Sequence, residues 1–145
     1  MNRWFLWCIS AICLITAGCY SVKFETEPLP PFFTCYRWID ADHDNRVAKS
    51  EVEGLNRPFY STYQTVCFMG EIHEPFGTIL SWELHGPDGS VNDRGTSLQL
   101  DDIMVYRNCY SVKDLVAAGG AGTWTMEWLV KEVKVGMVGA ELVEQ

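Results

Sequence analysis

The stretch Thr78-Ile79-Leu80-Ser81-Trp82-Glu83-Leu84-His85 alternates apolar and polar side chains, and it decides which fold the sequence predicts. Leu80, Trp82 and Leu84 occupy every second position. Because successive side chains of a β-strand point to opposite faces, this period predicts a strand with one face in a core and the other in water.

The same period continues on both sides of this strand. Further strands are predicted at residues 65–72, 96–104, 106–112, 123–130 and 133–143. Turns rich in Gly, Pro and Asp separate several of them, at residues 74–77, 86–89 and 119–122. Short strands without a long helical pattern predict a mainly β fold, here an antiparallel β-sandwich over residues 58–145.

Two cysteines and several tryptophans follow a recurring layout within these strands. Cys67 is followed by Trp82, then by Cys109, and then by the strand Trp124–Trp128. This order resembles that of an immunoglobulin-like sandwich, and residues 112–118 are similar to the short crossing between its later strands. The resemblance implies an immunoglobulin-like fold whose disulfide joins Cys67 and Cys109 between the two sheets.

Residues 1–18 have the features of a leader peptide rather than those of a segment of the folded domain. The positive segment Met1-Asn2-Arg3 precedes an uncharged apolar run at 4–17, which is short for a transmembrane helix. The run ends in Leu14-Ile15-Thr16-Ala17-Gly18-Cys19, which resembles the lipobox of bacterial lipoproteins. The resemblance implies a lipidated Cys19 and a lipoprotein anchored in the cell envelope, at the outer membrane facing the periplasm or at the cell surface.

The lipid-anchored residues 19–31 are rich in proline and predict an extended tether. Beyond the tether Cys35, Cys67 and Cys109 remain, and an oxidising compartment favours a disulfide among them. We expect Cys67 to pair with Cys109, with Cys35 free or competing. In its strand, however, Val66 and the apolar residues in phase with it turn Cys67 to the other face, so pairing of Cys35 with Cys67 or Cys109 stays open.

Residues 32–57 contain the acidic loop, Asp40-Ala41-Asp42-His43-Asp44-Asn45-Arg46-Val47-Ala48-Lys49-Ser50-Glu51. Asp40, Asp42 and Asp44 alternate, and Glu51 closes the stretch. Three alternate carboxylates in a tight turn can surround one hard cation, and without a cation they repel one another. The acidic loop is therefore the candidate metal site of the sequence.

The acidic loop resembles the calcium loop of an EF-hand, with acidic residues at its first, third, fifth and twelfth positions. The resemblance implies Ca²⁺ held by the carboxylates of Asp40, Asp42, Asp44 and Glu51 and by the backbone carbonyl of Arg46. Only one such loop is present, and Asn45 replaces the usual glycine. Tyr36-Arg37-Trp38-Ile39 is similar to the end of an incoming helix. A structural calcium site is expected rather than a paired sensor.

The composition argues against nucleic acid as a partner, because 19 Asp and Glu outnumber 11 Lys and Arg, for a formal charge of −8. The three histidines follow no metal-ligand motif, and no nucleophile motif is present. The sequence thus predicts a non-enzymatic binding or structural module, attached to the membrane by its lipid, with an envelope protein as its partner. The alternatives are an envelope enzyme using Cys35 or the acidic loop, and a calcium-responsive regulator.

Overall fold

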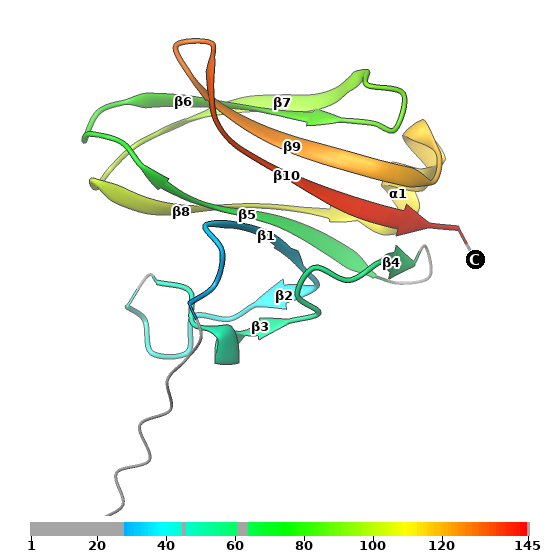
Figure 1. Cartoon of the computed structure of the whole chain (residues 1–145), viewed down its shortest axis with the longest axis horizontal. Coiled ribbons are helices and arrows are strands. Elements are labelled where there is room, and N and C mark those ends of the chain that lie inside the picture. Colours follow the sequence, from blue (N-terminus) through cyan, green and yellow to red (C-terminus); the bar gives the residue numbers. More distant parts are fainter. Residues whose placement is uncertain (1–27, 45, 61–63, 145) are drawn as a thin grey trace, which may run out of the picture.

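The computed structural model describes residues 28–44, 46–60 and 64–144. The predicted leader, Cys19 and most of the tether therefore lie outside the described residues. The described chain folds as a β-sandwich, in which two largely antiparallel sheets enclose a common core (Figure 1). The mainly β fold predicted from the alternation of side chains is confirmed.

Each strand belongs to one of three sheets. The first sheet has the order β1 (Phe32–Cys35), β5 (Thr65–His73) and β8 (Ile103–Ser111). The second has the order β4 (Phe59–Tyr60), β10 (Val133–Val143), β9 (Gly122–Val130), β6 (Ile79–His85) and β7 (Val91–Leu98), with β4 parallel to β10. A small separate sheet joins β2 (Arg37–Trp38) to β3 (Val52–Glu53).

The strand order is that of an immunoglobulin-like sandwich. Along the chain, β1, β5 and β8 form one sheet, while β6, β7, β9 and β10 form the other. The variable type of this fold places the third strand, an added edge strand and the last two strands together in the same way. The crossing from β8 to β9 contains the helix α1 (Val112–Gly119), whose first turn is capped by the Ser111 hydroxyl accepting from the Asp114 N–H.

The core lies between the two sheets and is formed by the predicted alternating faces. Leu80 and Leu84 of β6 and Trp124, Met126 and Trp128 of β9 are all fully buried in it. On β5 the same core takes up the apolar residues that the sequence pattern placed on one face. The amphipathic alternation thus predicts which residues each of these strands buries.

Two details of the sequence-based prediction are wrong. The strand expected at 96–104 is divided, because residues 99–102 form a loop between β7 and β8. Gln99 is buried in this loop, where its side-chain N–H donates to the Ile72 carbonyl and its carbonyl accepts from the Tyr106 hydroxyl. The end of an incoming helix expected at Tyr36–Ile39 is instead occupied by strand β2, which pairs with β3. The crossing expected at residues 112–118 lies where it was predicted and contains the helix α1.

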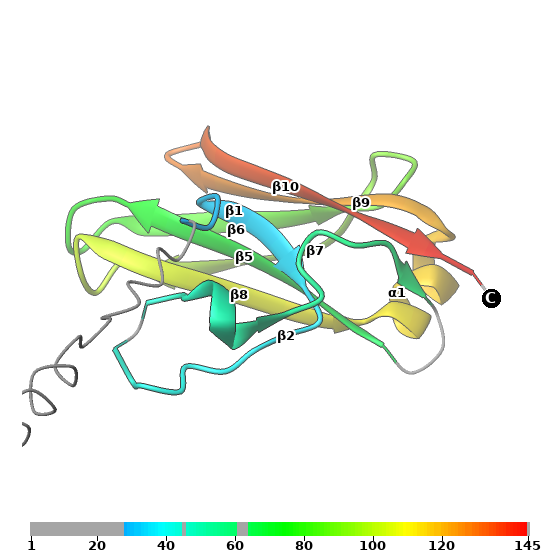
Figure 2. The ribbon, with the colours of Figure 1, turned by 60° about the horizontal axis from the view of Figure 1, so that its bottom comes forward.

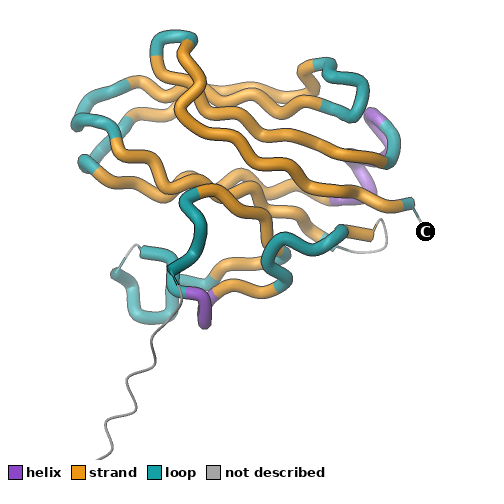
Figure 3. Tube along the Cα trace, viewed as in Figure 1, coloured by secondary structure: helices purple, strands orange, loops and turns teal. Residues whose placement is uncertain are grey.

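The sandwich extends beyond the expected residues 58–145, because β1 pairs along β5. Residues 36–57 are therefore inserted between two strands of the sandwich, β1 and β4, and we call them the cover segment. This segment holds the acidic loop, β2, β3 and the 3₁₀ helix η1 (Lys49–Glu51). Figure 3 shows how much of it is loop, compared with the strands above it.

The cover segment lies against the outer face of the β1–β5–β8 sheet, away from the second sheet (Figures 1 and 2). On that face, Phe33, Cys35, Cys67 and Met69 form a second buried group, which we call the outer cluster. The side chains packed against the outer cluster come from the tether, the cover segment and β8, and are Leu29, Trp38, Val47, Val52, Leu55 and Val105. The sheet thus has apolar residues on both of its faces.

Candidate metal site and the surface beneath it

The acidic loop brings three predicted ligands together. One carboxylate oxygen from each of Asp40, Asp42 and Asp44 lies within 4.8 Å of the others. The Asp44 N–H donates to Oδ1 of Asp40 at 3.2 Å and to Oδ1 of Asp42 at 3.3 Å, and the Arg46 N–H donates to Oδ1 of Asp44 at 2.7 Å. Hydrogen bonds from backbone N–H groups thus hold the loop in a turn around its carboxylates. The three aspartates could hold a metal ion.

The tight turn of the loop depends on a residue in the left-handed region. His43 has φ of 60° and stands between two of the aspartates. Non-glycine residues adopt this conformation uncommonly, although histidine, asparagine and aspartate do so more often than others. The sequence argument expected positive φ at Asn45, which lies outside the described residues.

Glu51 joins the two ends of the acidic loop. Its Oε1 accepts from the Ala41 N–H at 2.8 Å, while its Oε2 accepts from the Ala48 N–H at 3.2 Å and from the Trp38 indole N–H at 3.3 Å. The hydrogen bonds from Ala41 and Ala48 lower the pKa of the Glu51 carboxyl. Glu51 lies outside the group of three aspartates, so its direct part in holding an ion remains a prediction.

Negative charge accumulates within the acidic loop. The hydrogen bond from the Asp44 N–H lowers the pKa of Asp42, but desolvation and the repulsion from Asp44 and Glu51 outweigh it, and the net shift is upward. A raised pKa means that the Asp42 carboxyl ionises less readily in this loop than it would in water. A bound cation would relieve this repulsion, which is the electrostatic condition for a metal site.

The acidic loop also contacts the sandwich through its apolar residue. Val47 packs against the outer cluster together with Leu29 of the tether and Val105 of β8. A cavity of about 270 Å³ is lined by these side chains and by Phe33. The loop, the start of the described tether and the sheet therefore meet at one place.

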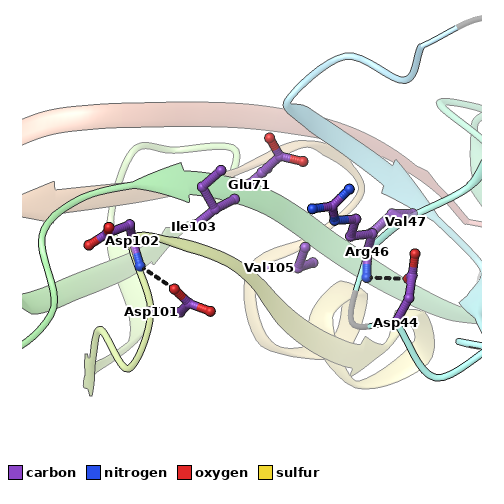
Figure 4. A pocket seen from close by; sticks show the side chains of 8 residues that line it. All are labelled: Asp44, Arg46, Val47, Glu71, Asp101, Asp102, Ile103 and Val105. Atoms are coloured by element: carbon purple, nitrogen blue, oxygen red, sulfur yellow. Dashed lines mark hydrogen bonds between the residues drawn. The ribbon is translucent and has the colours of Figure 1, made fainter.

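A larger cavity of about 620 Å³ lies between the acidic loop and one end of β5 and β8. Figure 4 shows Asp44, Arg46 and Val47 on the loop side and Glu71, Asp101, Asp102, Ile103 and Val105 on the sandwich side. The acidic residues of the sandwich side were not expected at the site, because strand pairing brings them there from distant parts of the chain. They add negative charge around the acidic loop.

The predicted disulfide between Cys67 and Cys109 is confirmed, but its predicted position between the two sheets is not. Cys67 and Cys109 are bonded, and they are direct neighbours on β5 and β8 within one sheet. The immunoglobulin-like resemblance implied a bond between the sheets, and this is wrong because Cys109 lies on β8 rather than on a strand of the second sheet. Cys35 is a free, buried thiol, and desolvation by burial raises its pKa to about 11 against the opposing charge of Arg107.

No protein-family model matches the chain, and no curated protein matches it. Among the described residues, no helix has the length and apolar character to cross a membrane. The functional argument therefore depends on the fold, the acidic loop and the surface beneath it.

Proposed function

We propose that this protein is a lipid-anchored, non-enzymatic module of the cell envelope, in which Ca²⁺ bound by the acidic loop fixes the tether to the sandwich. One observation carries the proposal. The loop that gathers Asp40, Asp42 and Asp44 within 4.8 Å is the same loop whose Val47 packs beside Leu29 on the outer cluster. Ordering the loop would therefore also fix the end of the tether that joins the sandwich. The partner of the module in this proposal is a protein of the cell envelope.

Calcium is the ion that suits this site best among common cations. The donor atoms are carboxylate oxygens on an exposed loop, and Ca²⁺ accepts six to eight oxygens in flexible geometry. Asp40, Asp42 and Asp44 supply the core of such a shell. The carboxylate of Glu51 and the backbone carbonyl of Arg46 complete it in the proposal. An affinity of about 10⁻⁴–10⁻³ M, typical of extracellular calcium modules, suits a structural ion.

The burial of Cys35 supports a non-enzymatic role over an enzyme that uses this thiol. The reactive form of a cysteine is the thiolate, and nucleophilic cysteines have a lowered pKa and are partly exposed. Cys35 has the opposite properties, since it is fully buried and its pKa is raised.

Calcium is expected to raise the melting temperature of the full-length protein isolated in detergent. At about 10 mM Ca²⁺ and the affinity given above, binding to the folded state alone stabilises it by about 1.4–2.7 kcal/mol. The double variant Asp42→Ala, Asp44→Ala is expected to lose this increase, because it removes two of the three gathered carboxylates. Thermal unfolding followed by circular dichroism, with calcium and with EDTA, measures both effects.

The matched control is the double variant Asp101→Ala, Asp102→Ala, which removes the same charge from the other side of the large cavity. It should keep the calcium-dependent increase. Equal melting curves in calcium and EDTA for the unmodified protein would contradict the calcium part of the proposal. A calcium-dependent rise in the binding of an apolar dye would instead favour the alternative of a calcium-responsive regulator.

The lipid anchor is tested separately at Cys19. Cells grown with a labelled fatty acid are expected to incorporate label into the protein, and the Cys19→Ser variant should carry none, because serine offers no thiol for acylation. The Cys35→Ser variant serves as the control and should be labelled like the unmodified protein. Label retained by Cys19→Ser would exclude Cys19 as the site of attachment.

A further inference from the structure

Three cysteines lie in one row across three adjacent strands. The strand register places Cys35 of β1 directly opposite Cys67 of β5, and Cys67 directly opposite Cys109 of β8. Residues that are directly opposite in a sheet have their side chains on the same face. All three sulfurs are therefore on the outer face of the sheet, where the cover segment lies.

The Cα atoms of the bonded Cys67–Cys109 pair are 4.0 Å apart, so this is a closely spaced, non-hydrogen-bonded pair. On its other side Cys67 faces Cys35 in a hydrogen-bonded pair, whose wider spacing lies within the range of disulfides. Directly opposite residues of antiparallel strands have Cα atoms about 4.5 or 5.5 Å apart. Disulfides form at Cα separations of about 4.4–6.8 Å. A bond from Cys35 to Cys67 thus needs rotation of side chains but no change in the strand pairing.

The order of the strands also determines from which side Cys35 would approach the disulfide. A thiolate breaks a disulfide by attacking one sulfur while the other sulfur leaves. Because β5 lies between β1 and β8, Cys35 approaches Cys67 from the side opposite to Cys109. Cys35 and Cys109 therefore flank Cys67 on opposite sides, which is the arrangement of residues that a displacement at the Cys67 sulfur favours.

We propose that the Cys35 thiol exchanges with the Cys67–Cys109 disulfide, which moves the free thiol to Cys109 and makes Cys109 a site of modification by disulfides and other thiol-reactive compounds. In this step the Cys35 thiolate forms a bond to Sγ of Cys67. The bond from Cys67 to Cys109 breaks, and Cys109 takes the electron pair and then a proton. The number of disulfides is unchanged, so no oxidant or reductant is needed. The Cys109 thiolate can then attack an external disulfide and release one of its halves as a thiol.

The exchange changes the accessibility of the free thiol. Cys35 is 0% exposed and Cys67 is 4% exposed, whereas Cys109 is exposed on β8 at the edge of the sheet. A thiol that starts beneath the cover segment thus becomes available at the surface. Burial keeps the thiolate fraction of Cys35 small at neutral pH, so the exchange is slow compared with reactions of exposed thiols.

The test uses a negatively charged maleimide on the full-length protein in detergent, without denaturant or reductant. Peptide mapping by mass spectrometry assigns each label and each disulfide to its cysteines, so the cysteines of residues 1–19 do not interfere. The expected result is label on Cys109 together with a Cys35–Cys67 disulfide in the same molecules. Label on Cys35 with the Cys67–Cys109 bond intact, or no label on any of these three cysteines, would overturn the proposal.

The Cys35→Ala variant is the matched control, because it keeps the original disulfide and removes only the attacking thiol. Its label on Cys109 should be lower by about tenfold or more, and equal labelling would overturn the proposal. The initial labelling rate should not change on dilution of the protein, because the exchange is intramolecular. If this variant fails to fold, the unmodified protein still decides the question, since a Cys35–Cys67 bond marks the exchange by itself.

Discussion

Replacing Cys67 with alanine is expected to lower the free energy of unfolding by about 4 kcal/mol, whereas Cys109→Ala should lower it by less than about 1 kcal/mol. The difference follows from the row of three cysteines. Cys67 lies at its centre and takes part in both disulfides that the register permits. Without Cys109, the Cys35–Cys67 bond can replace the lost one, but without Cys67 neither bond can form.

The expected magnitude comes from the length of chain that each bond closes. Cys67 and Cys109 are 42 residues apart, and a disulfide closing a loop of this length stabilises a protein by about 4 kcal/mol in the chain-entropy account. Cys35 and Cys67 are 67 − 35 = 32 residues apart. Because this contribution grows only with the logarithm of loop length, the two bonds differ by about 0.2 kcal/mol.

Urea unfolding under non-reducing conditions measures both variants after refolding with oxidised glutathione, which supplies the oxidant for the new bond. Cys35→Ala is the control, because it retains the original disulfide, and peptide mapping should show a Cys35–Cys67 bond in Cys109→Ala. If Cys109→Ala loses as much stability as Cys67→Ala, the two cysteines on β1 and β5 do not form a bond, and the exchange proposal fails with it.

Local patterns predicted the strands that have one face in the core. On β6 and β9 every second residue is large and apolar, and the sandwich buries these residues fully, except Trp82, which is partly buried against the core. Edge strand β7 gave a weaker pattern, since its first residues, from Val91 to Arg94, are exposed. The strand predicted at residues 96–104 therefore began too late and continued through Gln99. The polar side chain of Gln99 is buried, and it is hydrogen-bonded to residues of β5 and β8.

The gathering of the three aspartates was also predictable, because it depends on spacing within five residues. The surroundings of the acidic loop were not. The segment from Tyr36 to Ile39 is aromatic enough to resemble a helix end, but the Tyr36 N–H donates to the Glu53 carbonyl and the Ile39 N–H to the Glu51 carbonyl. Such long-range backbone pairing has no local signature in the sequence.

The relation among the cysteines required the strand register. Composition left all pairings of Cys35, Cys67 and Cys109 open, and the alternation on β5 showed only that Cys67 faces away from the main core. That same orientation places it on the outer face, beside both of the other cysteines. The feature that argued against an inter-sheet disulfide is thus the feature that makes the exchange geometrically available.

Gly54→Ala is expected to lower the free energy of unfolding by about 2–5 kcal/mol and to open the cover segment. Gly54 has φ of +69°, where an L-residue loses about 1–2 kcal/mol, and a Cβ atom there would collide with the ring of Tyr36. Overpacking of this kind adds about 1–3 kcal/mol. The Tyr36 ring packs edge-on against Phe59 at 5.0 Å, so displacing it loosens the join between the cover segment and the sandwich.

Gly89→Ala separates the two contributions, because Gly89 has φ of +81° but no atom within 4 Å of an added Cβ. This control should lose only about 1–2 kcal/mol, as measured by urea unfolding of both variants. The two variants should differ further in the outer cluster. Opening the cover segment exposes Cys35 and releases Val47, so Gly54→Ala should react faster with the maleimide and gain less stability from calcium. Equal labelling of the two variants would show that the cover segment does not control access to the cysteines.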